Sequence, residues 1–373
     1  MSKRPAWADV SVSAIGDNLR AISAFMGGRA AICAVVKAQA YGHGALPVAR
    51  AALEAGASLL AVALAEEGRE LREGGIKAPI LVLGAPQPEE ASDFLEFDLE
   101  ASVFEEAAIR AFAASAAAAG HRIRLHLKVD TGMSRVGCRP EAAANLAALI
   151  AGLPGLELAG VYSHFADADR PGSAFAREQL AAFTAALESI KTRGIAVPLR
   201  HIANSAGALL IPESRLDLVR LGIAMYGLRP DAVLDFPLAG IRPALTIRAR
   251  VTRLEEIEWG GTVSYGRTWK AGRRTRVATL PLGYADGYPR AASGQAWAGY
   301  EFDGKWIRLP QIGRVCMDMC MFDATGVPGL HQGSELVVAG PGGPSLDELA
   351  ALAGTINYEL ACHFGLRLPH RFS

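Results

Sequence analysis

The chain has 373 residues, of which 51% are hydrophobic and 20% are charged. This length and composition allow a large buried core and exclude a mainly disordered state. The 38 basic and 38 acidic side chains cancel, which argues against nucleic acid or an anionic membrane as the main partner. A net charge near zero tolerates self-association, so an oligomer is compatible with the composition.

The cysteines and the first residues indicate a cellular location. Five cysteines at irregular spacing predict reduced thiols rather than a disulfide framework. The first ten residues include Trp7 and Asp9 and no apolar stretch, so we expect no signal peptide. No apolar run reaches the roughly 20 residues that a membrane span requires. We therefore expect a cytoplasmic protein with no membrane segment.

Short apolar runs alternate with helical patterns over the first two thirds of the chain. The eight runs are Ile32–Val36, Leu59–Ala63, Ile80–Leu83, Glu100–Val103, Ile123–Val129, Leu158–Tyr162, Leu199–Ala203 and Leu216–Leu221. One helical pattern covers residues 180–190, and another, Glu105–Ala119, is followed by Gly120. Eight strands that alternate with helices predict an α/β fold, a (β/α)8 TIM-type barrel, over residues 1–239. An open doubly wound sheet is the alternative, but no GxGxxG or GxxxxGK follows an early strand.

The pattern changes near Pro237–Pro243, where alanine-rich helices give way to β-rich runs separated by Gly and Pro. The expected strands are Thr246–Val251, Arg276–Leu280, Trp306–Ile312, Cys316–Phe322 and Leu336–Ala339. One helix, Ser345–Ala353, begins with a capping box formed by Ser345 and Glu348. The sequence therefore predicts a mostly β C-terminal domain over residues 240–373.

Polar residues gather directly after five of the predicted barrel strands. They are Lys37 with the loop to Gly44, Lys128 with Asp130–Arg135, Ser163-His164, Asn204-Ser205 and Arg220–Ile223. Active sites of (β/α)8 barrels lie at this end of the strands, so we expect a site there. Burial next to the apolar strand would lower the pKa of Lys37, and such a lysine can form a Schiff base with an aldehyde. A strand-end lysine that merely reaches solvent is the alternative.

The segment Ala34–Gly44 (AVVKAQAYGHG) resembles the pyridoxal-phosphate motif of bacterial alanine racemases. The resemblance continues in order through KVDTGMSRVG, Ser163-His164-Phe165, HIANS, LDLVRLGIAMYG, VSYGRTW, LGYADGY, GRVCMDM and Tyr358-Glu359. It implies a barrel with a β-rich second domain, pyridoxal 5'-phosphate as cofactor, and a homodimer with shared active sites. Gln39 stands where the family usually has Asn, and His370 and Phe372 stand where it often has Arg and Tyr. These departures bear on positioning and substrate preference rather than on reaction class.

The resemblance also implies the catalytic residues. Lys37 would bind the cofactor and act as the base on one face of the substrate, and Tyr265 of the partner subunit would act on the other face. A tyrosine with a pKa of about 10 is a poor base at neutral pH, and His164 resembles the residue that hydrogen-bonds it. Arg220 matches an arginine at the ring nitrogen of the cofactor, where it can only donate, so transamination is disfavoured. The alternatives are that His164 is only structural, that Tyr265 only packs in the β-rich domain, and that Arg220 forms an ion pair with Asp217.

Binding roles follow from the same resemblance. The residues expected at the cofactor phosphate are Tyr41, Asn204, Ser205, Gly222, Ile223 and Tyr358. Hydroxyls and backbone N–H groups suit an anion there. Arg135 would read the substrate carboxylate, Met317 of the partner would contact the substrate through its backbone, and Tyr284 matches a tyrosine of the access corridor. Core packing is the alternative for Tyr41, Tyr358 and Met317.

Lys128 and Arg135 are expected in one cavity, where two cations repel. The resemblance implies that Lys128 is a carbamate, and an unmodified lysine paired with Asp130 or an anion is the alternative.

Cys316 and Cys320, expected on one face of a strand, lack the second ligand pair of a zinc site, so we expect no metal.

The sequence thus predicts an isomerase of the alanine racemase type, which interconverts L-alanine and D-alanine and supplies D-alanine for peptidoglycan. A racemase of broader amino-acid specificity on the same fold is the nearest alternative. A barrel-type pyridoxal-phosphate amino-acid decarboxylase is disfavoured by Arg220 and Tyr265. A pyridoxal-phosphate carrier protein would not need residues 240–373.

Overall fold

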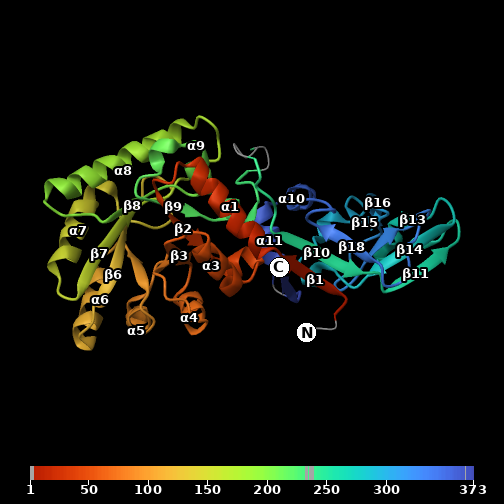
Figure 1. Cartoon of the computed structure of the whole chain (residues 1–373), viewed down its shortest axis with the longest axis horizontal. Helices are drawn as coiled ribbons and strands as arrows, with labels where there is room; N and C mark the ends of the chain where they lie inside the picture. Colours follow the sequence, from red (N-terminus) through yellow and green to blue (C-terminus); the bar gives the residue numbers. More distant parts are fainter. Residues whose placement is uncertain (1–3, 232–233, 235–238, 366) are drawn as a thin grey trace.

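The structure, a computed structural model, describes residues 4–231, 234, 239–365 and 367–373. Figure 1 shows an elongated molecule with a barrel at one end and a β-rich part at the other. The first strand, β1 (Ala6–Val10), and the C-terminus both lie near the junction of the two parts (Figure 1). The chain enters the barrel after a first strand and then passes into the β-rich part, which ends beside that first strand.

Eight parallel strands form the barrel. They are β2 (Ala31–Val35), β3 (Leu59–Val62), β4 (Ile80–Val82), β5 (Glu100–Val103), β6 (Ile123–Lys128), β7 (Leu156–Tyr162), β8 (Leu199–His201) and β9 (Leu218–Leu221). They pair in the order β8-β7-β6-β5-β4-β3-β2-β9. The remaining gap is bridged by the Arg220 N–H, which donates to the Ala203 carbonyl at 3.0 Å. All eight expected strands are present, and the (β/α)8 barrel is confirmed.

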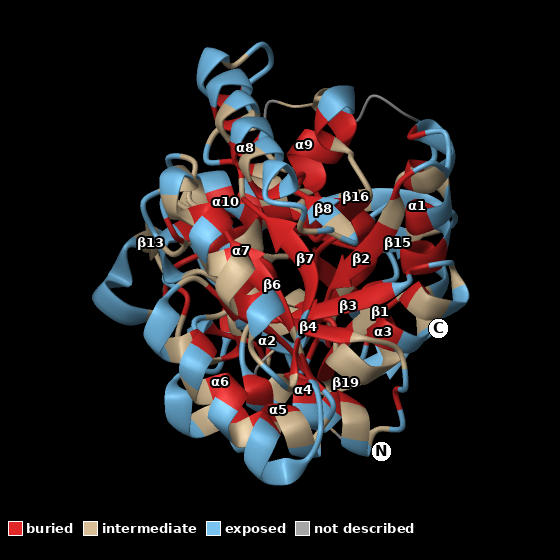
Figure 2. Cartoon of the chain, turned by 90° about the vertical axis from the view of Figure 1, so that its left-hand side faces the viewer, coloured by how far each residue is buried: buried red, intermediate tan, exposed pale blue. Residues whose placement is uncertain are grey.

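Helices cover the outside of the barrel. They are α1 (Val12–Phe25), α3 (Ala45–Glu54), α4 (Ala65–Glu73), α5 (Ala91–Glu96), α6 (Glu106–Ala119), α7 (Ala143–Gly152), α8 (Ala174–Thr192) and α9 (Ser205–Leu210). Figure 2 shows buried strands at the centre and helices whose outer faces are exposed. The helix α6 ends at Gly120, whose φ of 66° makes it a left-handed C-cap, as its sequence predicts.

The inside of the barrel is half apolar and half polar. Alternate residues of a strand face opposite sides of the sheet, and one set of these forms a small apolar cluster separate from the main core: Cys33, Val35, Leu59, Ala61, Leu81 and Leu218. On β5 to β9 the same alternation places buried polar residues inside: Glu100, Ser102, His126, Lys128, His201 and Arg220. Barrel interiors are more commonly filled by branched apolar side chains, so this polar half requires an explanation.

The β-rich part contains a nine-stranded sheet. Its strands are β1 (Ala6–Val10), β10 (Leu245–Arg250), β11 (Arg253–Ile257), β14 (Thr275–Leu280), β15 (Trp297–Phe302), β16 (Lys305–Ile312), β17 (Cys320–Asp323), β18 (Glu335–Ala339) and β19 (His370–Phe372). The order is β11-β14-β17-β16-β15-β18-β10-β1-β19. A small hairpin, β12 (Thr262–Val263) with β13 (Trp269–Lys270), and the helices α10 (Leu346–Ala353) and α11 (Asn357–Phe364) complete it. The expected mostly β C-terminal part is confirmed, and Ser345 and Glu348 form the expected capping box.

Two expectations need correction. Residues 6–10 were expected within the barrel domain, but β1 pairs with β10 and β19 of the other sheet, which buries Trp7. The strand expected at Cys316–Phe322 begins only at Cys320, because the Cys316 N–H donates to the Met319 carbonyl at 2.9 Å and closes a turn. Cys316 and Cys320 therefore do not share a strand face. Part of the expected boundary near Pro237 lies outside the described residues.

No helix in the described part of the chain is long and apolar enough to cross a membrane. All five cysteines lie in that part, and each is a free thiol.

Candidate active site

The carboxyl ends of the barrel strands surround a cavity of about 720 Å³. The predicted site residues that line it are Lys37, Tyr41, Lys128, Arg135, His164, Asn204, Ser205, Arg220, Gly222, Ile223 and Tyr358. Most of them end or follow β2, β6, β7, β8 and β9, because the ends of parallel strands meet at one face of a barrel. Tyr358 is brought there by α11 of the β-rich part. The structure thus brings eleven predicted residues together around one space.

Lys37 begins a left-handed turn, α2 (Lys37–Gly42). Ala38, Gln39, Ala40 and Tyr41 have φ values of 51°, 52°, 54° and 53°. Non-glycine residues in this conformation cost roughly 1–2 kcal/mol each, so the surrounding structure must hold the turn. This winding is an unusual conformation, and it places both Lys37 and Tyr41 at the cavity.

The helix α4 supplies contacts that hold this turn. Glu67 accepts the Ala38 N–H at 2.6 Å with Oε1 and the Ala63 N–H at 2.7 Å with Oε2. The Gln39 side chain donates to Glu70 at 2.8 Å. Two carboxylates of one helix therefore anchor the segment that follows Lys37.

Both lysines of the cavity have lowered pKa values. Burial lowers the pKa of Lys37, and the nearby Arg135 guanidinium lowers it further. Burial together with the Arg220 and Arg135 cations lowers the pKa of Lys128 to about 7. Lys128 Nζ lies 4.3 Å from the centroid of the Tyr162 ring. The alternative partner, Asp130, instead uses its Oδ1 to accept backbone N–H groups of the following loop.

The buried Arg220 guanidinium makes four hydrogen-bond contacts, three of which share the two hydrogens of Nη2. Its Nη1 donates to His201 Nδ1 at 2.7 Å. Its Nη2 donates to the Ser163 and Ile202 carbonyls at 2.7 and 3.0 Å and to His164 Nδ1 at 3.0 Å. Among the described residues, no hydrogen bond uses Nε–H or the second hydrogen of Nη1, so Arg220, which lines the cavity, keeps donors for an acceptor there.

The alternative ion pair between Arg220 and Asp217 is not formed. Asp217 pairs instead with Arg200, with 2.6 Å between Oδ2 and Nε.

The hydrogen bond from Arg220 also fixes the state of His164. An arginine can only donate, so His164 Nδ1 accepts and a neutral ring carries its proton on Nε2. Burial and the nearby Arg220 and Lys128 cations lower the pKa of His164 well below its usual value. His164 is therefore neutral at neutral pH and offers an Nε2–H donor.

One wall of the cavity has the features of a phosphate cradle. The Ser205 hydroxyl accepts the Gly222 N–H at 3.0 Å, which fixes the start of the short helix η4 (Ile223–Tyr226). A Cβ at Gly222 would lie 2.7 Å from the Tyr41 hydroxyl, so only glycine lets this phenol approach the backbone. Asn204 caps α9 by accepting the Gly207 N–H at 2.9 Å. Hydroxyls and helix-start N–H groups suit an anion.

Three predicted residues lie away from this cavity in a single chain. Tyr265 is 71% exposed, Met317 53% and Tyr284 42%. Tyr284 instead lines a separate hollow of about 400 Å³ with Tyr288 and His363.

Other residues of the cavity were not predicted from the sequence. Tyr162 is the last residue of β7 and lies at an inward position, which its strand pattern could have indicated. Cys362 comes from α11, and Leu83 follows β4. No sequence signal singled out these two. Within the part of the chain that the structure describes, no group of three or more His, Cys, Asp or Glu residues could hold a metal ion.

Comparison with known proteins identifies the family. A family model for the alanine racemase N-terminal domain matches residues 10–230, and one for the C-terminal domain matches residues 244–372. The chain belongs to the alanine racemase family. An alanine racemase of Desulforamulus reducens is 43% identical over 98% of this chain and 98% of its own length. One of Desulfovibrio desulfuricans is 40% identical over 98% of this chain and 97% of its own.

Solved structures of alanine racemases have the same fold. The enzyme from Streptomyces lavendulae matches with a TM-score of 0.92 at 38% identity and covers 100% of this chain and 98% of its own. The Bacillus anthracis alanine racemase with bound L-Ala-P matches with a TM-score of 0.91 at 34% identity, over 100% and 96% of the two chains. The barrel and the β-rich part are therefore the arrangement of the alanine racemase family.

Proposed function

We propose that this protein is an isomerase that interconverts L-alanine and D-alanine with pyridoxal 5'-phosphate, in active sites shared by the two subunits of a homodimer. The observation that carries the proposal is the convergence of Lys37, Arg220 and the phosphate cradle on one cavity. Membership of the alanine racemase family supports the same reaction. We further propose that it acts in the cytoplasm and supplies D-alanine for peptidoglycan, and that the chain divides into domains near residue 240.

The residues of the cavity fit pyridoxal phosphate. Lys37 offers an amine of lowered pKa for the aldehyde, and Arg220 offers its Nε–H to the ring nitrogen. The phosphate group would be held by Tyr41, Ser205, Gly222, Ile223 and Tyr358, with Asn204 orienting the same loop. Glycine at position 222 leaves space for the Tyr41 hydroxyl beside the backbone. When bound, pyridoxal phosphate acidifies the Cα–H of an attached amino acid.

The chain's own residues would then move the Cα proton between two faces. Lys37 Nζ takes or returns a proton on one face, and the partner subunit's Tyr265 acts on the other. A protonated phenol cannot take up the Cα proton, so this step needs the phenolate form of Tyr265, and that anion needs stabilisation. The His164 Nε2–H, fixed by Arg220, provides a hydrogen-bond donor for it.

Arg135, a cation that lines the cavity, would bind the substrate carboxylate. We propose that Lys128 is carbamylated and, as an anion, orients the Arg135 guanidinium. Arg220 only donates to its acceptor, so the ring nitrogen stays unprotonated. That state limits electron withdrawal and favours return of the proton over transamination.

The exposure of Tyr265, Met317 and Tyr284 supports the shared-site arrangement. Large apolar side chains gathered on a surface commonly mark an interface, and these three belong to motifs that resemble the family. The partner would place its Met317 backbone near the substrate and its Tyr284 in the access corridor.

Two measurements test the proposed function. The purified protein with pyridoxal phosphate should convert L-alanine to the racemate, followed by circular dichroism, and a panel of amino acids would separate strict from broad specificity. Borohydride reduction and peptide mapping should place the cofactor on Lys37. Release of carbon dioxide would indicate a decarboxylase, binding without turnover would indicate a carrier, and a label on another lysine would contradict the assignment.

A further inference from the structure

A chain of buried polar side chains leads from the cavity to the opposite end of the barrel. From Arg220 Nη1 it runs to His201 Nδ1 at 2.7 Å. From His201 Nε2 it reaches His126 Nδ1 at 3.1 Å, and from His126 Nε2 it reaches Glu100 Oε2 at 2.8 Å. His126 and His201 are fully buried, and Glu100 and Arg220 are 5% and 2% exposed. This chain crosses the polar half of the barrel interior.

The barrel is built to hold this chain in place. A Cβ at Gly160 of β7 would lie 2.5 Å from His126 Nδ1, so the absence of a side chain there makes room for the ring. The Tyr162 ring stacks on His201 with 4.8 Å between centroids and 2° between planes. The Tyr162 hydroxyl is in turn hydrogen-bonded to Ser102 at 2.7 Å. Both imidazole rings are therefore fixed in orientation by packing.

Arg220 and Glu100, at the two ends of this series of hydrogen bonds, determine which nitrogen of each histidine carries the proton. Arg220 can only donate, so His201 Nδ1 accepts and its proton lies on Nε2. His201 then donates to His126 Nδ1, which places the proton of His126 on Nε2. That proton points at Glu100, whose carboxylate only accepts. A doubly protonated His126 would direct N–H against the N–H of His201, so both rings are neutral.

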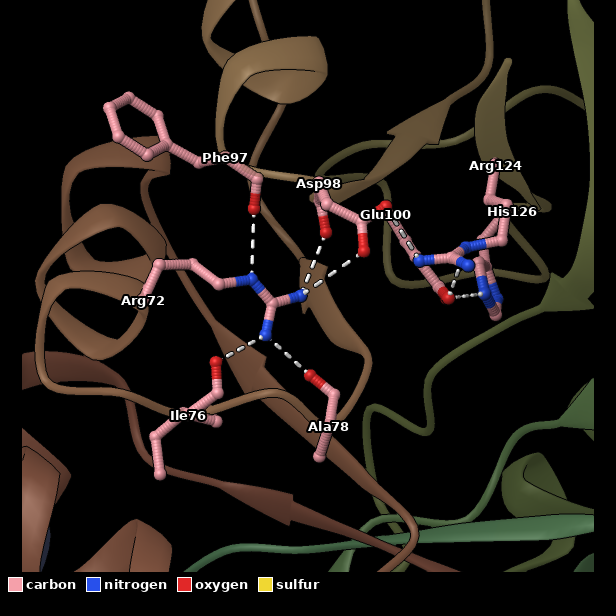
Figure 3. A network of polar contacts seen from close by, with 8 residues as sticks. All are labelled: Arg72, Ile76, Ala78, Phe97, Asp98, Glu100, Arg124 and His126. Carbon is pink, nitrogen blue, oxygen red and sulfur yellow. Dashed lines mark hydrogen bonds and ion pairs between the residues drawn. The ribbon is translucent and has the colours of Figure 1, made fainter. Parts of the chain in front are cut away.

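Glu100 is anchored at the outer end by Arg124, and Arg72 fixes the neighbouring loop (Figure 3). Its Oε1 lies 2.9 Å from Arg124 Nε, and Arg124 also contacts Asp98 at 3.1 Å. Arg72 donates to backbone carbonyls of the Asp98 loop and of residues 76–78, which fixes that loop. Burial raises the pKa of Glu100, but the hydrogen bond from His126 and the Arg124 guanidinium leave it below its usual value. The outer end of the chain is therefore an ionised carboxylate.

We propose that Glu100 and His126 are positioning residues that act on the cofactor through His201 and Arg220. The carboxylate fixes the direction of every hydrogen bond in the chain. It thereby holds the Arg220 guanidinium, which lines the cavity, so that its Nε–H stays available to an acceptor there. This proposal rests on the proposed function in one respect: the acceptor of Nε–H in the cavity is taken to be the ring nitrogen of the cofactor.

Glu100→Gln tests the chain with little change of shape. A carboxylate accepts from His126 and Arg124 at once, whereas an amide offers one accepting oxygen and one donating nitrogen. In the variant, the amide NH2 group must therefore face another N–H donor, either that of Arg124 or that of His126. Asp98→Asn is the matched control, because Asp98 loses the same charge beside the same Arg124 but is not part of the chain to His126.

The readout is cofactor binding by the apoprotein, measured with pyridoxal phosphate and with its 1-deaza analogue, which has C–H in place of the ring nitrogen. Glu100→Gln should weaken pyridoxal phosphate binding roughly tenfold, the size expected for one weakened hydrogen bond from a charged donor. It should leave binding of the analogue unchanged, and Asp98→Asn should change neither. Equal weakening of both ligands, or no weakening of either, would overturn the proposal.

A second measurement needs no variant. In protein labelled with ¹⁵N-histidine, the side-chain NMR spectrum should show His126 and His201 as neutral Nε2–H tautomers between pH 6 and 8, with or without cofactor. A proton on Nδ1 of either ring would overturn the chain even if Glu100→Gln failed to fold. Equal affinity of the unaltered protein for the two ligands, with these tautomers intact, would instead contradict the proposed placement of the ring nitrogen at Arg220.

Discussion

Lys128 is a potential cation at a place that disfavours cations, because it is buried and faces Arg220 and Arg135. With a pKa of about 7, about half of its amine is neutral near pH 7 and more is neutral above it. A neutral amine adds to carbon dioxide, forming an N–C bond and releasing one proton. The product is an anion among cations, which removes the repulsion.

We therefore expect a carbamate on Lys128 near neutral pH. Protein in ¹³C-bicarbonate should give a carbamate signal in the carbon NMR spectrum that Lys128→Arg lacks. Below about pH 6 the amine is protonated and the signal should disappear, since protonation competes with carbamylation. A bare amine at Lys128 in fully active enzyme at pH 7.5 would contradict the prediction.

Arg220 is the residue whose replacement should change the reaction rather than only its rate. In Arg220→Glu, a carboxylate would accept a hydrogen bond from the protonated ring nitrogen and keep it protonated, which strengthens electron withdrawal. We expect racemisation to fall and side transamination to rise relative to it, measured as pyruvate formed for each racemisation event. Glutamate cannot donate to the Ser163 and Ile202 carbonyls, so we also expect a loss of about 2–4 kcal/mol in the free energy of unfolding. An unchanged ratio of the two reactions in folded variant would contradict the assigned role.

At the scale of elements, the left-handed turn after Lys37 depends on a helix that touches neither substrate nor cofactor in our proposal. Glu67→Ala leaves the N–H groups of Ala38 and Ala63 without their acceptor. We expect a loss of about 1–3 kcal/mol in the free energy of unfolding, measured by urea denaturation. The control is Glu66→Ala, an exposed residue of the same helical turn, which should change stability by less than about 0.5 kcal/mol. Equal effects of the two variants would show that the turn does not need Glu67.

Most barrel strands were predictable because they are short runs that contain several apolar residues and are largely buried. The strand β1 was not, because its pairing with β10 and β19 joins segments more than 200 residues apart. The strand β11 was also missed, since it is largely exposed and has only two apolar residues out of five. The strand β15 was missed although Trp297, Tyr300 and Phe302 make it rich in aromatic residues. The turn at Cys316–Met319 shows the opposite error, in which an apolar run was interpreted as a strand.

At the scale of the whole molecule, the candidate site was predictable wherever residues follow barrel strands. The fold alone brings Lys37, Lys128 and Arg220 to one face. The chain from Arg220 to Glu100 was not predictable, because it depends on which side chains face inward and on the space that Gly160 leaves. Tyr265 and Met317 pose a third case: a single chain does not place them at the cavity, so their roles depend on a partner.

That dependence makes the quaternary structure testable by mixing two inactive proteins. Lys37→Ala lacks one base and Tyr265→Ala lacks the other. If each site takes Lys37 from one subunit and Tyr265 from the other, a mixed dimer contains one site with both residues and one site with neither. Random exchange gives about half mixed dimers.

The mixture should therefore recover about one quarter of the activity of the unaltered protein, since half of the dimers have one of two sites intact. Neither variant alone should recover activity, and a mixture of Lys37→Ala with a Lys37→Ala, Tyr265→Ala double variant should remain inactive, which controls for contamination. Subunit exchange is verified independently by native mass spectrometry of differently tagged chains. If exchange is complete and no activity returns, both bases come from the same subunit, and the exposed Tyr265 must reach the cavity of its own chain by a rearrangement of the β-rich part.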